Sequence, residues 1–289
     1  MKKHLLRLGY NDLQDLPPIK DILSKYNINA DKKLGQNFLF DGNLTDKIAR
    51  SSGSLEGKSV IEVGPGPGLL TRSILAAGAD RVIAVEKDER CITALNDYLV
   101  PESGERLSIV NADALKTDIY IKNDGKVKII ANLPYNISTE LLFMWLENID
   151  KFESLTLMFQ KEVAMRIMAK PKTKDYGRLS IKAQLLCDIE YEFDIPPCAF
   201  YPPPKVTSTV ITLTPRKEPV AKVNMQTLEN LCKATFGQRR KTLRVSLKQL
   251  TKNPIEILKS ASIDENKRPE ELSVKQFCDL ANSLDSLNN

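Results

Sequence analysis

Four consecutive residues, Asn132-Leu133-Pro134-Tyr135, carry groups that could hold an amino group for reaction. The Asn132 side-chain oxygen and the Leu133 carbonyl can each accept an N–H bond, and Tyr135 offers a ring on which a base can stack. Pro134 has a fixed φ and no N–H, which stiffens the turn. Two acceptors on an amino group whose lone pair is delocalised into a ring would localise that pair, so catalysis would rest on positioning and electrostatics. The alternative is a plain Asn-x-Pro turn.

A glycine-rich stretch, Glu62-Val63-Gly64-Pro65-Gly66-Pro67-Gly68, lies upstream of this tetrapeptide. Glycines let a backbone approach a ligand closely and tolerate positive φ. The spacing is G-x-G-x-G, and Leu69 stands where the G-x-G-x-x-G of a dinucleotide-binding loop needs its last glycine. With an acidic residue before it, this spacing resembles the S-adenosylmethionine loop of Rossmann-like methyltransferases.

Two acidic residues follow the next two expected strands. Glu86 ends a strand over 81–85, where a carboxylate can accept both ribose hydroxyls of a nucleoside. An ordinary strand-end carboxylate is its structural alternative. Asp113 follows a strand over 106–110, where it can accept from an adenine amino group, although aspartate after a strand is usually a turn former.

Strands and helices alternate between residues 58 and 169, which predicts a doubly wound parallel sheet. Ligands of such sheets bind at the carboxyl ends of the strands. Two more β-rich stretches, 190–195 and 206–213, are expected to pair as an antiparallel hairpin at the sheet edge. The expected strands are 58–63, 81–85, 106–110, 127–131 and 154–159, and the expected helices are 69–77, 90–99, 139–146 (with Ser138 as N-cap) and 161–169.

After Pro215 the pattern is purely helical, so we predict three regions. Residues 1–31 form a loosely held extension with a short helix near 19–26. Residues 32–217 form the α/β domain, and residues 218–289 form a smaller helical domain. In that helical domain Gly237 ends one helix, Asn253-Pro254 and Arg268-Pro269 start others, and Ser273 with Gln276 makes a capping box.

Basic residues are concentrated in the helical region. The whole chain carries 42 Lys and Arg against 37 Asp and Glu, a net charge of +5. Residues 216–259 alone hold eleven basic and three acidic residues, so the rest of the chain is slightly acidic. A local basic surface of this kind suits binding to a phosphate backbone, and a solvated helix face is the alternative.

Other classes of protein are disfavoured by composition. The longest apolar run that we find, Leu141–Leu146, is far shorter than the roughly 20 residues of a membrane-spanning helix. Five scattered cysteines without a C-x-x-C pair, and one histidine, His4, argue against a zinc site and a disulfide scaffold. We therefore expect no metal, no signal peptide and a cytoplasmic location, and histidine-based acid–base catalysis is excluded unless His4 performs it.

A proline-rich segment, Phe200–Val206 (FYPPPKV), is rigid and extended. Enzymes that modify bases take the base out of its stack, and aromatic side chains then hold it. Phe200 would in that case close the face of the base opposite Tyr135. The alternative is a loop whose phenylalanine fills the core.

Seven motifs, in order, carry a family resemblance. The chain resembles the small-subunit ribosomal RNA adenine N6,N6-dimethyltransferases of the KsgA type from Leu34 to its C-terminus. The resemblance implies a Rossmann-like class I methyltransferase sheet with a smaller all-helical C-terminal domain. The motifs are Leu34–Leu39 (LGQNFL), Glu62–Gly68, Glu86, Ala112-Asp113, Asn132–Tyr135 with Asn136-Ile137-Ser138, Phe200–Val206 and Phe236–Leu243 (FGQRRKTL).

The resemblance also implies the chemistry. S-adenosyl-L-methionine would donate methyl groups to the N6 amines of two adjacent adenosines, in a hairpin loop near the 3′ end of 16S-type RNA. The cofactor would leave as S-adenosylhomocysteine. The partner would be the assembling small ribosomal subunit, and we expect a monomer without membrane contact.

Site residues carry over by their place in the motifs. Cofactor-binding residues would be Gln36, Asn37 and Leu39 at the methionine end, Gly64 and Gly66 by backbone, Glu86 at the ribose, Asp113 at the adenine, and Asn132. Catalytic residues would be Asn132, Leu133, Pro134, Tyr135 and Phe200. RNA-binding residues would be Arg239, Arg240, Lys241 and Lys205.

Several rivals remain open from the sequence. A large-subunit RNA adenine methyltransferase of the antibiotic-resistance type shares most motifs, although the FGQRRK and Pro-Pro-Pro stretches favour the small-subunit class. DNA adenine and protein glutamine methyltransferases more typically carry proline where Leu133 stands. A nicotinamide oxidoreductase is disfavoured by Leu69, and a non-catalytic assembly factor by the intact Asn132–Tyr135. The stretch before Lys32 is longer than the family pattern, and Pro67 varies the usual glycine loop.

Overall fold

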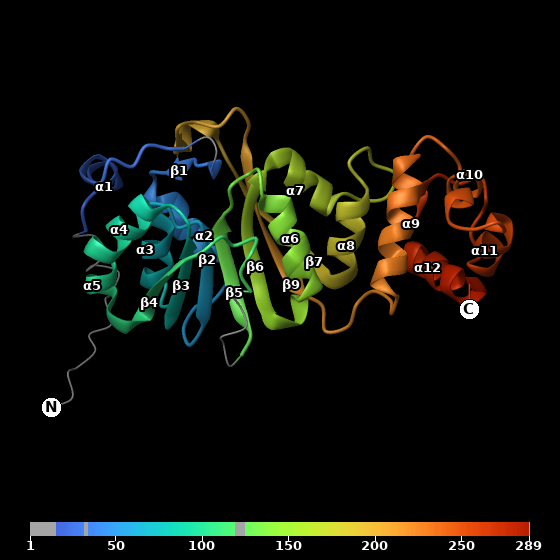
Figure 1. The fold of residues 1–289 in the computed structure, drawn as a ribbon, viewed down its shortest axis with the longest axis horizontal. Helices are drawn as coiled ribbons and strands as arrows, with labels where there is room; N and C mark the ends of the chain where they lie inside the picture. Colours follow the sequence, from blue (N-terminus) through green and yellow to red (C-terminus); the bar gives the residue numbers. More distant parts are fainter. Residues whose placement is uncertain (1–15, 32–33, 119–124, 289) are drawn as a thin grey trace. The chain divides into compact units, whose positions relative to one another are not determined.

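The computed structural model describes residues 16–31, 34–118 and 125–288, and the chain forms two compact units. Figure 1 follows the chain from α1 to α12. The first unit comprises the described residues up to Lys161 together with Glu190–Pro215. The second comprises Glu162–Ile189 together with the chain from Arg216 onward. This division differs from the predicted domains, because residues 162–189 were assigned to the α/β domain of 32–217.

A seven-stranded sheet organises the first unit, in the order β4-β3-β2-β5-β6-β9-β7. Neighbouring pairs among β2 to β6 are parallel, whereas β9 runs antiparallel to β6. Strands β9 and β7 are adjacent at the sheet edge, as expected for the two β-rich stretches. The predicted Rossmann-like methyltransferase sheet is confirmed. Its strands are β2 (Ser59–Val63), β3 (Arg81–Glu86), β4 (Leu107–Asn111), β5 (Val127–Asn132), β6 (Phe152–Gln160), β7 (Cys187–Ile195) and β9 (Ser208–Pro215).

Helices of the first unit begin where the predictions set them, with one correction. Ser138 is the first residue of α6 rather than its N-cap, and its hydroxyl donates to the Tyr135 carbonyl at 3.1 Å. Two helices, α2 and the short α5, were not predicted. Helix α2 begins after Asp41, whose side chain accepts from the Asn43 N–H. The helices are α1 (Ile19–Lys25), α2 (Gly42–Ser51), α3 (Leu69–Ala76), α4 (Glu89–Tyr98), α5 (Val100–Ser103) and α6 (Ser138–Glu147).

The segment 16–31 is packed on the first unit, so the expectation of a loosely held extension is wrong for these residues. Ile19, Ile22 and Leu23 are buried in the same hydrophobic cluster as α2, α3 and α4. A guanidinium N–H of Arg72 donates to the Pro17 carbonyl at 2.8 Å. These apolar residues share one helix face, a signal that is weak over only seven residues. Residues 1–15 lie outside the described part.

A two-stranded sheet joins two distant predicted motifs. Strand β1 (Phe38–Leu39) pairs antiparallel with β8 (Phe200–Tyr201), with Leu39 opposite Phe200. Phe40 stacks on Tyr201, the ring centroids being 5.6 Å apart. The proline-rich segment therefore braces the LGQNFL motif.

Helices build the second unit around a separate core. The predicted capping box is present: the Gln276 side chain accepts from the Ser273 N–H at 3.0 Å, and the Ser273 hydroxyl accepts from the Gln276 N–H at 3.2 Å. Pro269 starts only a short 3-10 turn, Pro269–Glu271. The helices are α7 (Lys161–Met168), α8 (Arg178–Leu186), α9 (Met225–Gly237), α10 (Leu243–Ser246), α11 (Pro254–Ser260) and α12 (Val274–Asn288).

Helix α8 was missed by the sequence analysis, because it is buried almost all round and shows no amphipathic stripe. Even Lys182 is only 5% exposed, and its ammonium pairs with Glu229 at 2.5 Å.

In the described residues no helix is both long and apolar enough to cross a membrane.

Candidate active site

One cavity of the first unit collects the predicted site. It lies where β2, β3, β4 and β5 end, as expected for ligands of a doubly wound sheet. All eight predicted cofactor-binding residues line it, as do Leu133, Pro134 and Tyr135. Its wall has four parts: residues 34–39, residues 62–67 with 69–70, residues 85–87 with 112–115, and residues 132–137.

The glycine loop turns sharply around the end of β2. Gly64, Gly66 and Gly68 all have positive φ, at 71°, 54° and 91°. The Gly66 N–H donates to the Glu86 carboxylate at 3.0 Å, which ties the loop to the end of β3. A Cβ on Gly66 would come within 2.9 Å of the Phe38 ring. Backbone groups of the loop thus form the cavity wall because the residues lack side chains.

Substituting Gly68→Ala should destabilise the protein by roughly 3 kcal/mol, since positive φ and steric overlap both oppose a side chain there. Its Cβ would lie 2.6 Å from a Leu95 methyl group and from the Tyr98 hydroxyl. Gly42→Ala is the matched control, because a Cβ there meets nothing within 4 Å. Urea unfolding of both variants measures the difference, and equal midpoints would contradict the packing described.

Glu86 is a buried carboxylate that its own backbone surroundings orient. It is 6% exposed, and one oxygen accepts from the Lys87 and Asp88 N–H groups at 2.8 and 2.9 Å. The other oxygen accepts from Gly66. Burial raises the pKa of Glu86, although these hydrogen bonds oppose the shift. The carboxylate is therefore fixed in place at the cavity wall.

Glu62 also lines the cavity, and the sequence analysis did not propose it as a site residue. It is 1% exposed, and its Oε2 has no hydrogen-bond partner among the described residues. Burial raises the pKa of Glu62 to about 8, and the charge of Glu86 adds to the shift. Its position as the acidic residue before the glycine loop was the available signal. A buried acceptor without a partner is costly unless a ligand pairs with it.

Asp113 makes a turn contact, one of the two roles that the sequence left open, and it also lines the cavity. Its Oδ1 accepts from the Leu115 N–H at 3.1 Å, which is a turn contact. Its other oxygen lies 3.3 Å from the Lys87 ammonium. The Leu115 N–H, with help from Lys87, holds the pKa of Asp113 below its usual value. A charged acceptor therefore stands at the cavity wall.

Asn132 ends β5 and touches the LGQNFL motif. Its amide N–H donates to the Asn37 carbonyl at 3.2 Å. Because the nitrogen is used in this way, the amide oxygen is the side-chain atom left to accept from a ligand. The contact joins the Asn132–Tyr135 turn to residues 34–39 across the cavity.

Tyr135 is held by its hydroxyl at the same turn. The hydroxyl lies 2.5 Å from the Ser208 hydroxyl, and burial raises the pKa of Tyr135. Leu133 is 1% exposed, so its side chain anchors the turn in the core. Pro134 lies 3.7 Å from the Cβ position of Gly64, which packs the turn against the glycine loop.

Phe200 does not line this cavity. The residue is 4% exposed and belongs to the hydrophobic cluster of the first unit. Its partner across the two-stranded sheet is Leu39, which does line the cavity. In this structure the phenylalanine fills the core, the alternative given for it above, and it does not close the site opposite Tyr135.

The residues proposed to bind RNA differ in what they contact. In the second unit Arg239 donates to the Thr173 carbonyl at 2.9 Å and lies 3.8 Å from the Glu270 carboxylate. Arg240 and Lys241 are exposed. Lys205 is exposed in the first unit, outside the cavity lining. Arg239 is therefore engaged with Thr173 and Glu270 of its own unit, and Arg240 and Lys241 are the more exposed cations of the motif.

Comparison with known proteins assigns the family. The model of the family described as "Ribosomal RNA adenine dimethylase" matches residues 27–286. A Ribosomal RNA small subunit methyltransferase A from Xanthobacter autotrophicus is 50% identical over 279 residues, covering 95% of this chain and 96% of the relative.

Two solved structures resemble the whole fold. A dimethyladenosine transferase from Plasmodium falciparum has a TM-score of 0.77 at 26% identity, covering 87% of this chain and 98% of that one. The 23S rRNA methyltransferase ErmE has a TM-score of 0.65 at 27% identity, covering 86% and 100%. With the family model spanning nearly the whole chain and its motif residues gathered around one cavity, the protein belongs to the ribosomal RNA adenine dimethylase family.

Proposed function

We propose that this enzyme dimethylates the N6 amines of two adjacent adenosines, in a hairpin loop near the 3′ end of small-subunit ribosomal RNA. S-adenosyl-L-methionine is the proposed methyl donor. One observation carries the proposal: the Asn132–Tyr135 turn lines the same cavity as the glycine loop and Glu86. A base held at the turn would thus face a nucleoside cofactor held by the loop.

The cavity fits a cationic cofactor. Glu62 and Glu86 are both buried there, and burial raises the pKa of each. A ligand that brings positive charge would relieve this cost, whereas the pyrophosphate of a dinucleotide would add to it. S-adenosyl-L-methionine carries an ammonium and a sulfonium group. We assign Glu62 to the ammonium and Glu86 to the ribose.

The protein's part in the reaction is to hold the amine. The Asn132 amide oxygen and the Leu133 carbonyl accept the N–H bonds of the adenine amine, and the Tyr135 ring stacks on the base. The bound cofactor supplies an electrophilic methyl group. Because the amine proton becomes acidic only as the nitrogen gains positive charge, no residue has to act as general base beforehand. Positioning and electrostatics then provide the rate enhancement.

The small subunit is favoured over the large one as substrate. The relative at 50% identity is a small-subunit methyltransferase, whereas the 23S rRNA methyltransferase ErmE is 27% identical. Methyl transfer from labelled cofactor to undermethylated small subunits tests the substrate, with large subunits, free RNA and DNA in parallel. N6,N6-dimethyladenosine formed only with small subunits is the expected product. Label in large-subunit RNA would overturn the assignment, and cofactor binding without any transfer would favour a non-catalytic assembly factor.

We assign RNA docking to the basic surface of the second unit, which extends the predicted role of residues 218–289. Arg240→Glu with Lys241→Glu should weaken binding to small subunits by about 10-fold or more, and should make the salt dependence of log K shallower by about two. Filter binding at several salt concentrations measures both quantities.

Lys151→Glu is the control for docking, because Lys151 is an exposed lysine of the first unit that already pairs with Asp150. Equal losses in both proteins would point to overall charge instead of a docking surface.

Lys205 stays a candidate contact. A cytoplasmic monomer that needs no metal is the state that we propose for the enzyme at work.

A further inference from the structure

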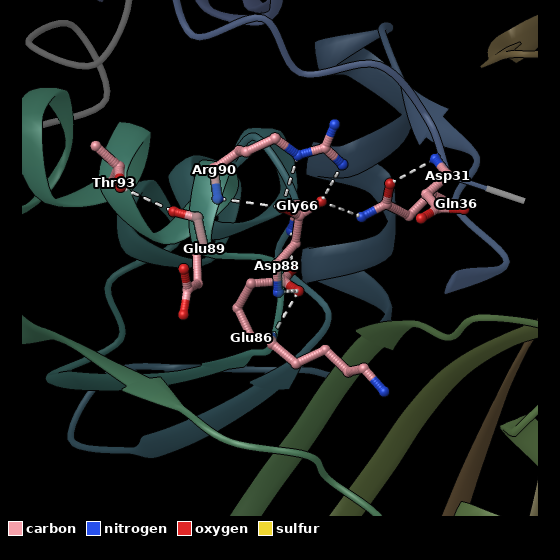
Figure 2. A network of polar contacts seen from close by, with 9 residues as sticks. Asp31, Gln36, Gly66, Glu86, Asp88, Glu89, Arg90 and Thr93 are labelled. Atoms are coloured by element: carbon pink, nitrogen blue, oxygen red, sulfur yellow. Dashed lines mark hydrogen bonds and ion pairs between the residues drawn. The ribbon is translucent and has the colours of Figure 1, made fainter. Parts of the chain in front are cut away.

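Gln36 lines the cavity, yet both ends of its side-chain amide are bound to the protein (Figure 2). The amide oxygen accepts from the Asp31 N–H at 2.9 Å. The amide nitrogen donates to the Asp88 carboxylate, also at 2.9 Å. Gln36 therefore spans between its own segment and the start of α4 instead of offering its amide to a ligand.

Asp88 is the centre of this network. The residue is 6% exposed, and Arg90 grips its carboxylate through two guanidinium nitrogens at 2.9 and 2.7 Å. Burial alone would raise the pKa of Asp88, but hydrogen bonds from Arg90 and Gln36 outweigh it and hold the pKa below the usual value. The carboxylate is therefore a charged acceptor at neutral pH, which strengthens the bond from Gln36.

The backbone of Asp88 connects the same network to the ribose site. Its N–H donates to Glu86 at 2.9 Å, and Glu86 in turn accepts from Gly66 of the glycine loop. Figure 2 shows Gln36, Asp88, Glu86 and Gly66 in one continuous chain of contacts. On the other side of the cavity, the Asn37 carbonyl accepts from Asn132. The dipeptide Gln36-Asn37 thus reaches both the ribose side and the methyl-transfer side of the cavity.

We propose that Gln36 and Asp88 are positioning residues, which fix residues 34–39 as the wall of the cofactor site and so set the affinity for S-adenosyl-L-methionine. The inference rests on the proposed function, because it takes that cofactor as the ligand. The far end of the segment is held separately, by the pairing of the two-residue strand β1 with β8. Loss of the Gln36–Asp88 bond would let the wall move away from the cofactor while Asn132 still holds the amine.

The test reverses the polarity of the bond. Gln36→Glu keeps an oxygen for the Asp31 N–H but sets a carboxylate against Asp88, so the KM for S-adenosyl-L-methionine should rise about 10- to 100-fold. The kcat at saturating cofactor should stay within about threefold, because the amine-holding groups are untouched. The KM for small subunits should not change.

The double variant Gln36→Glu with Asp88→Asn restores the hydrogen bond between these two residues, now donated by residue 88, although the same change removes the oxygen that accepts from Arg90 Nη2. Asparagine also keeps the N-cap acceptor of α4, which Asp88 supplies to the Arg90 N–H at 3.1 Å. We expect the KM of the double variant to be at least about tenfold lower than the KM of Gln36→Glu. Independent structural damage by the two substitutions would not produce such coupling. Glu89→Gln, an exposed neighbour on the same turn, is the control and should leave KM unchanged.

Arg90→Ala approaches the same carboxylate from its solvent side and covers the case in which an Asp88 variant does not fold. The Arg90 side chain is 40% exposed, so the fold should tolerate its loss, and KM for the cofactor should rise about threefold or more. Unchanged KM in Gln36→Glu, or a double variant no better than the single one, would overturn the proposal. Calorimetry of the unaltered enzyme with S-adenosylhomocysteine distinguishes failure of the proposed cofactor from failure of the positioning role. Absence of binding would refute the proposed cofactor. Binding to the unaltered enzyme, together with an unchanged KM in the variants, would refute only the positioning role.

Discussion

Asn132→Ala should abolish measurable methyl transfer, a loss of at least about 100- to 1000-fold in kcat, because it removes one of the two acceptors that hold the amine. The RNA affinity should stay nearly intact, since the docking surface that we propose lies in the other unit. The KM for the cofactor should rise only a few-fold, because the substitution also removes the 3.2 Å bond to Asn37. Single-turnover transfer on small subunits and filter binding measure these quantities.

Asn148→Ala is the matched control for this prediction. Asn148 lies at the end of α6, and its amide donates to the Met144 carbonyl of its own helix, at 3.3 Å. The same change of side chain there should leave the transfer rate intact. A fully active Asn132→Ala enzyme would remove the proposed mechanism, and loss of RNA binding would show that the turn also docks the substrate.

Glu62→Gln should stabilise the ligand-free protein but lower its affinity for the cofactor. The pKa of Glu62 rises from 4.5 to about 8 on folding. The folded state therefore keeps a proton that the unfolded state releases, and the unfolding free energy falls as pH rises from about 4.5 to about 8. The full shift corresponds to roughly 5 kcal/mol above pH 8, and to roughly 3 kcal/mol at pH 7.

Glutamine does not titrate, so the stability gain of Glu62→Gln should be small near pH 5 and largest above pH 8. Urea unfolding at both pH values measures it. Glu153→Gln provides the opposite sign: ion pairs with Lys58 and Lys128 outweigh partial burial and hold the pKa of Glu153 low, so its loss should destabilise the protein at neutral pH. A Glu62 variant whose stability gain does not change with pH would contradict the raised pKa.

The pH dependence of cofactor binding should also report the protonation state of Glu62. Pairing with the cofactor's ammonium requires the charged form of Glu62, so the affinity of the unaltered enzyme should increase with pH up to about 8. In Glu62→Gln this dependence should disappear and the affinity at pH 8 should drop. Calorimetric titrations across pH 6 to 8 would test the pairing independently of catalysis.

Strand ends explain why much of the site was predictable. Glu86 and Asn132 each close a strand, and the carboxyl ends of neighbouring parallel strands lead to one edge of the sheet. The glycine spacing then marked the loop between β2 and α3. Local sequence thus carried enough information for the residues that stand on the sheet itself.

Contacts between distant segments were not predictable in the same way. Nothing near Phe200 shows that it faces Leu39, because the pairing of β1 with β8 brings together residues far apart in the chain. Gln36 was assigned to the cofactor, whereas its amide is bound by Asp31 and Asp88. Helix α8 was not predicted because it is buried on nearly all sides. Hydrophobic periodicity indicates only helices that have one solvent-exposed face.

The interleaving of the two units has a consequence for how this chain is made and dissected. Helix α8 is synthesised well before α9. Until α9 follows, Ile181 and Leu185 therefore lack Leu228 and Leu231, which belong to the same hydrophobic core. The first unit likewise gains its edge strands only after that excursion, when residues 190–215 have been synthesised. A truncated enzyme ending at Pro215 would carry this half-built core exposed to solvent. We therefore expect that the catalyst cannot be cut at Pro215 without leaving this core incomplete.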